Sequence, residues 1–476
     1  MAGVTGIGSG IDIDSIVKSM VAAERAPKES QLVTLEKKTT TQITAIGALR
    51  SAISEFQTAL GTLNKPELFQ ARSATSSKSD LVGVSAGTKA GPGRYQVEVK
   101  QLAAASKVAL AAVENSSEAP ARFSSGSLKI QLGNEGSFVV SVDEGNNTMA
   151  GIRDAINKQG AERGVTATIV TDDDGARLVL SSSKTGAGKD ITVTPTLAGD
   201  VEDGYTSLDI LKFNGVDATA PTGARTLTAA QSAIITVDGL PVTSASNKVD
   251  GAIEGVTLDL KAKTPTGEPL AITVAEDKAG VRKQIQSFVD SYNKLIGVVN
   301  AQTKVTSVGE GKAPLAGALV GDATARTMLG SIRNELVNAK GDGPLRALAD
   351  LGITTQKDGT LKIDDTKLSK VMDSNFADLS GVFTGESGLA ARLDVTLKPY
   401  AQAGGILEQR SKAMTETISK IDKQKADLDR RITSLQERLY KQFNAMDTLV
   451  GKMANTSSSL LASLENLPWA ANNARK

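Results

Sequence analysis

The sequence predicts an α+β multidomain protein with an antiparallel helical coiled-coil stalk, formed by both terminal regions, and an inserted, mainly β head. Two observations predict the stalk: near each end of the 476-residue chain, apolar residues recur at alternating spacings of three and four. A third predicts the head, because the apolar period falls to two between these seams. Antiparallel pairing of two distant seams brings the termini together and leaves the middle of the chain as an insertion.

Residues 1–31 are predicted to be a flexible terminal segment that leads into the first helix. Three glycines separate the apolar residues Val4, Ile7 and Ile11, and a fourth precedes Val4. A glycine-rich segment with apolar side chains gains order on a partner surface. These three side chains are therefore candidates for contact with a partner.

The first seam defines residues 32–78 as the N-terminal coiled-coil helix of the stalk. Its apolar positions follow a heptad, with Thr39 and Gln42 as polar interruptions, and Pro66 ends the helix. The seam positions expected to carry the helix pairing are Leu32, Leu35, Ile46, Leu49, Ile53 and Phe56.

Short alternating segments broken by Gly, Asn and Asp turns predict a β head of two small modules. We expect a discontinuous inner domain of residues 79–115 with 226–275, and an outer domain of residues 116–225. A short helix at about residues 148–158 interrupts the outer strands. The predicted strands are residues 94–100, 127–132, 137–142, 164–170, 177–180, 234–239, 256–260 and 270–274.

Two loops of the head have residue types found in ligand sites but not the required spacing. Residues Asp172 to Gly175 lack the alternating oxygen ligands and the later glutamate of a calcium loop. Residues Thr185 to Asp190 lack the earlier glycine and the following Ser or Thr of a phosphate loop. Both segments are predicted to be turns or loops.

Residues 276–405 are predicted to be a helical stalk domain with a small hairpin. Apolar residues at helical spacing from Val281 to Val299 indicate one helix, and shorter helical patterns follow at residues 326–336 and 366–379. Between these two patterns, residues 353–363 predict a hairpin around a Lys-Asp-Gly turn.

The second seam defines residues 406–455 as the C-terminal coiled-coil helix, followed by a tail of residues 456–476. Lys425 and Gln442 are its polar entries, and a long helix in an ordinary bundle is the alternative reading of this segment. The seam positions expected to carry the pairing are Ile418, Ile421, Leu428, Ile432, Leu435, Leu439 and Leu449.

Composition excludes several classes of function. The chain has no histidine and no cysteine, which removes Cys/His zinc sites, Ser/His/Asp triads and disulfides. We therefore predict no catalytic, cofactor-binding or metal-binding residue. With 54 basic and 53 acidic residues and no basic block, nucleic acid is not an expected partner. No window approaches 18 consecutive apolar residues, and the N-terminus lacks a secretory signal pattern, so no membrane span is expected.

Several passages resemble one known family when they are taken in order. They are Gly6 to Asp14, Ile253 to Leu260, Phe288 to Asn293, Gly352 to Thr355 and Asp358 to Leu361. A further set resembles a module shared with flagellins: Met149 to Asn157, Gly164 to Ala167 and Arg177 to Ser181. Together they make nearly the whole chain similar to the flagellar filament cap family, also called hook-associated protein type 2.

This resemblance implies a non-enzymatic protein at the distal tip of the bacterial flagellar filament. Such a cap promotes the folding and polymerisation of exported flagellin and prevents loss of its subunits. The resemblance also implies a ring-shaped homo-oligomer, expected to be a pentamer although other ring sizes stay open. Head domains would form a plate, stalks would be legs on the last flagellin subunits, and Val4, Ile7 and Ile11 would contact the filament.

The resemblance implies further partners and a location. The partners are flagellin, hook–filament junction proteins and a cytoplasmic type III export chaperone that holds about residues 453–476. The location is extracellular, at the flagellum tip, after secretion through the flagellar type III export channel without a cleaved signal.

Three alternatives stay open at the level of the sequence. In the first, the chain is another flagellar axial protein, either a flagellin or a hook–filament junction protein. In the second, the head is a tip adhesin that binds host mucin, in place of the capping role or in addition to it. In the third, a given seam leucine only stabilises a monomeric stalk, because a coiled-coil position does not reveal whether its neighbour belongs to the same chain.

Overall fold

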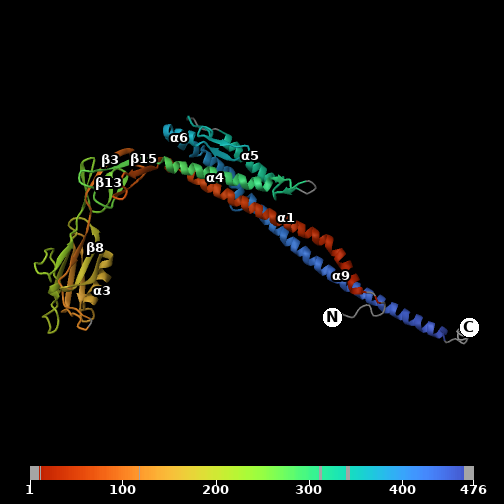
Figure 1. Ribbon diagram of the computed structural model, residues 1–476, viewed down its shortest axis with the longest axis horizontal. Helices are drawn as coiled ribbons and strands as arrows, with labels where there is room; N and C mark the ends of the chain where they lie inside the picture. Colours follow the sequence, from red (N-terminus) through yellow and green to blue (C-terminus); the bar gives the residue numbers. More distant parts are fainter. Residues whose placement is uncertain (1–9, 11, 117, 310–313, 339–343, 466–476) are drawn as a thin grey trace. The chain divides into compact units, whose positions relative to one another are not determined.

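A computed structural model describes residues 10, 12–116, 118–309, 314–338 and 344–465 of the chain. The chain divides into two compact units, one made of residues 1–66 with 280–476 and the other of residues 67–279 (Figure 1). The first unit is mainly helical and the second mainly β. Each unit has its own core and is described by itself.

Two long helices from opposite ends of the sequence dominate the helical unit. Helix α1 covers Ile13–Leu63 and helix α9 covers Ile406–Glu465, and the two lie side by side (Figure 1). Shorter helices pack in the same unit, with α8 against both α1 and α9. Their bounds are Lys278–Thr303 for α4, Ala323–Val337 for α5, Asp365–Ser374 for α6, Leu379–Phe383 for α7 and Leu389–Ala401 for α8.

An aromatic cluster holds α1, α4 and α7 together. The ring of Phe56 on α1 lies 5.6 Å from that of Phe288 and 5.7 Å from that of Tyr292, both on α4. Phe288 in turn lies 6.3 Å from Phe383 on α7. All four side chains are fully buried, and offset or edge-on aromatic pairs at these distances add to the energy of area burial. A predicted seam residue, Phe56, is therefore also part of a globular core.

Two small hairpins complete the helical unit. Strands β18 (Ile353–Thr355) and β19 (Leu361–Ile363) form the predicted hairpin, and β16 (Val305–Thr306) pairs with β17 (Leu315–Ala316). Helix α4 holds the first hairpin through the Tyr292 hydroxyl, which donates to the carbonyl of Gly359 at 3.0 Å.

The β unit contains two separate hydrophobic cores. The inner core lies between a five-stranded sheet of order β1-β15-β3-β11-β12 and a three-stranded sheet of order β13-β14-β2. Every pairing in these two sheets is antiparallel. The strand bounds are Arg72–Ser76 (β1), Val82–Ala86 (β2), Gly93–Gln101 (β3), Ala233–Val237 (β11), Leu240–Ser244 (β12), Lys248–Ile253 (β13), Val256–Leu260 (β14) and Leu270–Glu276 (β15).

The outer core is formed by a four-stranded sheet of order β10-β4-β8-β7, a three-stranded sheet of order β6-β5-β9, and helix α3 (Met149–Gly160). Thr148 caps α3 by accepting from the amide of Gly151. Ile152 and Ile156 of α3 are fully buried in this core. The strand bounds are Ala105–Ala109 (β4), Gly126–Leu132 (β5), Ser137–Val142 (β6), Val165–Asp172 (β7), Gly175–Thr185 (β8), Ile191–Leu197 (β9) and Arg225–Thr228 (β10).

Three predicted boundaries are wrong. The stalk helix does not extend to residue 78, because α1 ends at Leu63, a short helix α2 follows at Pro66–Gln70, and residues 72–76 form β1 of the inner sheet. Residues 105–109, assigned to the inner domain, form β4, which pairs with β8 and β10 in the outer module. The helical pattern at residues 366–379 is divided between α6 and α7 by a 3₁₀ turn at Phe376–Asp378.

No helix in the described part of the chain combines the length and the apolar character that crossing a membrane requires.

Candidate functional site

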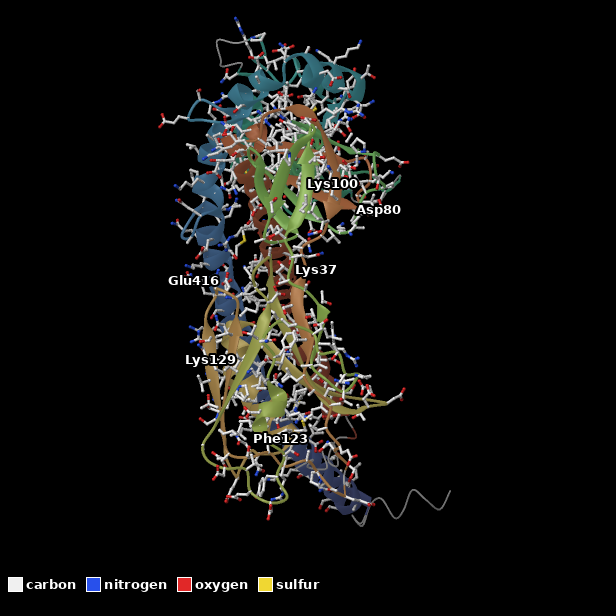
Figure 2. All side chains as sticks on the ribbon, turned by 90° about the vertical axis from the view of Figure 1, so that its left-hand side faces the viewer. Lys37, Asp80, Lys100, Phe123, Lys129 and Glu416 are labelled. Atoms are coloured by element: carbon white, nitrogen blue, oxygen red, sulfur yellow. The ribbon has the colours of Figure 1, made fainter. Side chains whose placement is uncertain are left out.

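The helix pair α1/α9 is the feature that brings most of the predicted functional residues together. Ion pairs between the two helices join residues in opposite sequence order, which fixes the pairing as antiparallel. These pairs are Arg50–Glu408 at 3.3 Å, Glu36–Lys425 at 2.5 Å, Arg25–Asp429 at 2.8 Å and Glu24–Arg431 at 2.7 Å. The remaining faces are charged and exposed, as Lys37 on α1 and Glu416 on α9 illustrate (Figure 2).

Most of the predicted seam residues of α1 lie on its buried face. One predicted position, Leu35, is instead 42% exposed. Thr39, a polar entry in the seam, is buried because its hydroxyl donates to the carbonyl of Leu35 at 2.8 Å in the preceding turn. The buried predicted residues are Leu32, Ile46, Leu49, Ile53 and Phe56.

The predicted seam of α9 is buried at three positions and becomes more exposed toward the C-terminal end. Ile421, Ile432 and Leu439 are buried, whereas Ile418, Leu428 and Leu435 are half-buried. Leu449 is 58% exposed and has no partner helix among the described residues. Of the two polar entries, Lys425 pairs with Glu36 across the helices, and Gln442 is exposed to solvent.

A small apolar cluster packs α1 against α9 near the start of α1. Ile13 and Val17 are fully buried against Leu439. Beside them, the Tyr440 hydroxyl donates to Asp14, and Lys18 lies 2.6 Å from the same carboxylate. The Lys18 ammonium and the Tyr440 hydroxyl lower the pKa of Asp14.

This cluster lies outside the predicted seam, which begins at Leu32. The available signal was the spacing of four between Ile13, Val17 and Val21.

Between this cluster and Leu32, the ion pairs Arg25–Asp429 and Glu24–Arg431 join the two helices. A groove of about 430 Å³ lies there, lined by Glu24, Lys28, Gln424, Asp427, Leu428 and Arg431. Pro27 occurs inside α1 at this level, where its ring removes one backbone donor from the helix. The α1 side chains that line the groove are charged, so Leu428 is only half covered.

Helix α9 continues beyond the start of α1 (Figure 1). This part of α9 carries a stripe of exposed apolar side chains. We name this the α9 stripe and define it by its residues. They are Met446, Leu449, Val450, Met453, Leu460, Leu461 and Leu464, between 38% and 65% exposed. Exposed apolar side chains that share one helix face in this way indicate an interaction site.

The predicted partner-contact residues Val4, Ile7 and Ile11 lie outside the described residues. Residues 466–476 of the segment proposed for chaperone binding also lie outside them.

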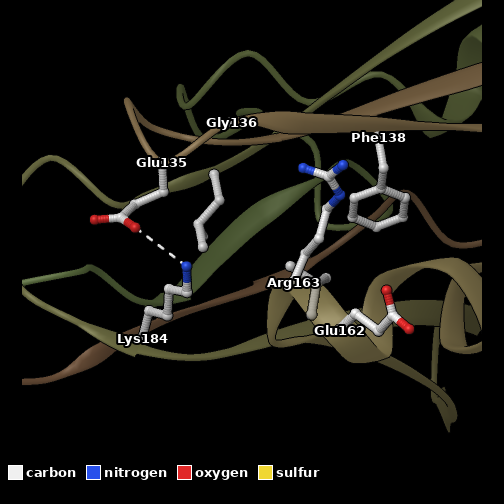
Figure 3. A pocket seen from close by; sticks show the side chains of 8 residues that line it. Glu135, Gly136, Phe138, Glu162, Arg163 and Lys184 are labelled. Atoms are coloured by element: carbon white, nitrogen blue, oxygen red, sulfur yellow. Dashed lines mark hydrogen bonds and ion pairs between the residues drawn. The ribbon is translucent and has the colours of Figure 1, made fainter.

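The head contains pockets among its described residues. A hollow of about 280 Å³ is lined by Leu132, Glu135, Gly136, Phe138, Glu162, Arg163, Val165 and Lys184 (Figure 3). Glu135 lies 3.1 Å from both Lys189 and Lys184, and these two ammonium groups lower the pKa of its carboxyl. The negative charge of Glu135 is therefore balanced by two lysines of the same chain.

The acidic turn at residues 172–175 joins β7 to β8, as predicted. Its carboxylates are engaged by Arg177, which is almost fully buried and lies 2.7 Å from Asp172 and 3.2 Å from Asp174. The Arg177 guanidinium also lowers the pKa of Asp172. In the described residues, no group of three or more His, Cys, Asp or Glu side chains is placed to hold a metal ion.

Comparison with known proteins identifies the family. The model for the flagellar hook-associated protein 2 N-terminus matches residues 9–106, and that for the C-terminus matches residues 230–455. The flagellin hook IN motif matches residues 127–184 only, within the outer head module.

Individual relatives are similar in sequence to this chain over nearly its full length. A B-type flagellar hook-associated protein 2 from Pseudomonas aeruginosa is 47% identical over 99% of both chains. Flagellar hook-associated protein 2 from Salmonella typhimurium is 32% identical over 96% of both chains. The crystal structure of the D1-D2-D3 domains of flagellar cap protein FliD from Escherichia coli superposes with a TM-score of 0.61 at 29% identity, covering 78% of this chain and 99% of that one. The chain therefore belongs to the flagellar hook-associated protein 2 family.

Proposed function

We propose that this chain caps the distal end of the bacterial flagellar filament, where it promotes folding and polymerisation of exported flagellin and prevents its loss. Family membership supports this function over the alternatives, because both halves of the chain match hook-associated protein 2 and the flagellin-derived motif is confined to the head. The single structural observation that supports it best is the antiparallel α1/α9 pair, which ends in the exposed α9 stripe.

The helix pair is the proposed leg. Its charged outer faces remain solvated, and the α9 stripe offers apolar surface for contact with the filament. The half-filled groove beside Pro27 lowers the packing energy of the distal part of the pair, which suits a leg that must release one filament site and engage the next. The predicted filament contacts Val4, Ile7 and Ile11 precede α1 in the sequence.

The oligomer, the partners and the export route are part of the same proposal. The protein forms a ring, expected to be a pentamer, with its β heads as the plate, and it meets flagellin and the hook–filament junction proteins in the flagellum. A cytoplasmic type III export chaperone covers the C-terminal apolar residues, including Leu460, Leu461 and Leu464, before export through the flagellar channel to the extracellular tip. A non-enzymatic role fits the neutralised carboxylates of the head.

Deletion of residues 1–30 tests the leg assignment. This deletion removes Ile13, Val17 and the half of the cluster that α1 supplies, but it leaves both cores of the β unit intact. We expect a folded head by circular dichroism and no filament growth in cells that lack the native protein, with the full-length chain restoring growth as the control. Filaments of normal length from the truncated chain would contradict the assignment.

Electron microscopy and mass measurement of the purified protein test the ring. Closed rings of one size are expected, since a head-to-tail interface closes only at a defined rotation. Extended filaments would instead favour a flagellin. Mucin binding by the head is a separate hypothesis from the same sequence, and absence of binding by the full-length protein would remove it.

A further inference from the structure

One loop of the outer head module combines an asparagine with a following glycine. The loop joins the short 3₁₀ helix Leu208–Leu211 to strand β10, and its residues Asn214 and Gly215 form the only Asn-Gly pair in the sequence. Both residues are exposed, and Gly215 has a φ of +90°, a backbone conformation that favours glycine. Because glycine has no Cβ, other atoms can approach its backbone nitrogen closely. The Asn214 side chain therefore precedes an unshielded peptide nitrogen.

The carboxamide of Asn214 is turned toward this nitrogen. Its Oδ1 accepts a hydrogen bond from the amide of Val216 at 3.2 Å, which closes an Asx turn around the peptide bond between Asn214 and Gly215. Within the described part of the chain, the Gly215 amide donates no hydrogen bond, so its nitrogen is not held by another acceptor. The Val216 amide points at the oxygen that gains negative charge when a nucleophile adds to Cγ of Asn214, and a donor in that position stabilises the charge.

Two anchors hold the loop on either side of the pair. Before it, Phe213 is buried and exchanges two backbone hydrogen bonds of 2.8 and 2.9 Å with Val193 of β9. After it, Nη1 of the buried Arg177 donates to the carbonyls of Thr222 and Gly223 at 3.2 and 2.9 Å. Residues 214–220 between these anchors are all exposed. A chemical change at Asn214 is therefore confined to the surface and leaves the outer core intact.

We propose that Asn214 is a site of spontaneous deamidation, with the backbone nitrogen of Gly215 as the nucleophile. A bond forms between this nitrogen and Cγ of Asn214, and the side-chain nitrogen leaves as ammonia with the proton from the Gly215 amide. The product is a five-membered succinimide. Water then opens the ring: its hydroxyl adds to one of the two ring carbonyl carbons, and its other proton returns to the Gly215 nitrogen as the C–N bond breaks. No atom is oxidised or reduced.

The two modes of ring opening give different products. Opening at Cγ gives aspartate with the original backbone, whereas opening at the backbone carbonyl gives isoaspartate, which adds one carbon to the main chain. Either product places a new carboxylate three residues before Asp217 in the exposed loop. The outer head module thus gains negative charge irreversibly and without an enzyme. The inference concerns the chemistry of the folded chain and does not depend on the capping function.

Incubation of the full-length folded protein in heavy-oxygen water, at physiological pH and temperature, tests the proposal. Deamidation incorporates one heavy oxygen at the modified residue, and peptide mass spectrometry locates it and distinguishes aspartate from isoaspartate. The internal control is Asn134, which is also exposed in the outer module but is followed by Glu135. We expect deamidation at Asn214 to be on the order of ten times faster than at Asn134, because the open glycine nitrogen lies next to the carboxamide.

Two further comparisons separate the effect of the loop from the effect of the Asn-Gly pair alone. A synthetic peptide with the sequence around Asn214 is incubated in parallel, and we expect the folded protein to react at least as fast as this peptide, because the Val216 amide already engages Oδ1. Gly215→Ala is expected to slow the reaction by about tenfold. A Cβ at this position comes no closer than 3.9 Å to another atom, and circular dichroism checks that the variant is folded.

Three results would overturn the proposal. Equal rates at Asn214 and Asn134 would show that the pair is not a preferred site. A slower reaction in the folded protein than in the peptide would show that the loop protects the carboxamide. An unchanged rate in Gly215→Ala would show that the open nitrogen of the glycine is not the cause.

Discussion

At the scale of single residues, three asparagines use both ends of the side-chain amide to hold a backbone segment. Each accepts a hydrogen bond from the amide of its partner residue and donates one to that residue's carbonyl, as a neighbouring strand would. The distances are 2.7 and 3.0 Å for Asn157 with Ala167, 2.7 and 2.8 Å for Asn293 with Leu361, and 2.7 and 2.9 Å for Asn247 with Ala103. Asn157 and Asn293 end two of the passages that carry the family resemblance, so this bonding gives those passages a physical role.

Replacing Asn293 by Asp tests this role. The carboxylate keeps the acceptor for the Leu361 amide but loses the donor, and it faces the Leu361 carbonyl with like partial charge. We expect the helical unit to lose about 1–3 kcal/mol of unfolding free energy, measured by denaturant titration at neutral pH. The control is Asn300→Asp, where a single exposed bond to the Asp358 carbonyl is lost. Equal losses in both variants would contradict a special role for the paired bonds.

A second residue-scale prediction concerns Asp322, which caps α5 and joins it to α9. Its carboxylate accepts from the Ala325 amide at 3.0 Å and from both terminal nitrogens of Arg410. The Arg410 guanidinium lowers the pKa of Asp322. Because the folded-state pKa lies below the unfolded value of about 3.9, the stabilisation is present above that value and is lost as pH falls through the folded-state pKa.

Asp322→Asn isolates the charge, since asparagine also caps helices well. We expect the variant to be less stable by about 1–2 kcal/mol near neutral pH, and the difference to shrink below pH ~4. Thermal unfolding across this pH range measures it. A difference that stays constant with pH would mean that the ion pair is not its source.

At the scale of elements, helices and strands with a regular apolar period could be predicted from the sequence, and a strand without such a period could not. Strands β6 and β14 have the bounds that their alternation predicts, and α4 contains the whole of the predicted helix. Strand β1, with sequence Arg-Ser-Ala-Thr-Ser, has no apolar alternation and lies in the range predicted to belong to the stalk helix. It is a strand because β15 pairs with it along five residues, a tertiary context that local sequence does not contain.

The heptads predicted which residues lie on the paired face of each long helix but not where the pairing stops. Leu32 and Leu449 both satisfy a heptad, and yet Leu32 is buried and Leu449 is exposed. The difference arises because α9 extends beyond the start of α1. Spacing within one helix carries no information about the length of its partner.

The Glu36–Lys425 pair gives the element-scale prediction. Lys425 is a polar entry in the predicted seam, and its ammonium lies 2.5 Å from Glu36, with both side chains about one-third exposed. We expect Lys425→Glu to destabilise the helix pair and Glu36→Lys in the same chain to restore it, with a coupling energy of roughly 0.5–1 kcal/mol that falls in high salt. Thermal unfolding of the two single variants and the double variant measures the coupling. Additive effects would show that the two side chains do not interact in solution.

At the scale of the whole molecule, the chain consists of two units with separate cores, and it passes between them twice, near residues 66 and 280. The change of apolar period along the sequence predicted this division into head and stalk, whereas the boundary residues follow from strand pairings such as β1 with β15. The two ends of the β unit meet in that pairing, so the insertion begins and ends on adjacent strands. An insertion closed in this way folds as a unit without requiring the host to be complete.

Separate cores predict separate unfolding transitions for the full-length protein. Ile156 is fully buried in the outer head core and Ile285 is fully buried in α4, so truncating either to Ala removes about 2–5 kcal/mol from its own unit. In differential scanning calorimetry we expect two transitions, of which Ile156→Ala lowers only one and Ile285→Ala only the other, by about 2–4 °C per kcal/mol. If each variant moved both transitions equally, or the chain melted in a single two-state step, the two units would be one cooperative body. Independent melting is what a cap requires if its legs rearrange at the filament tip while its heads keep their fold.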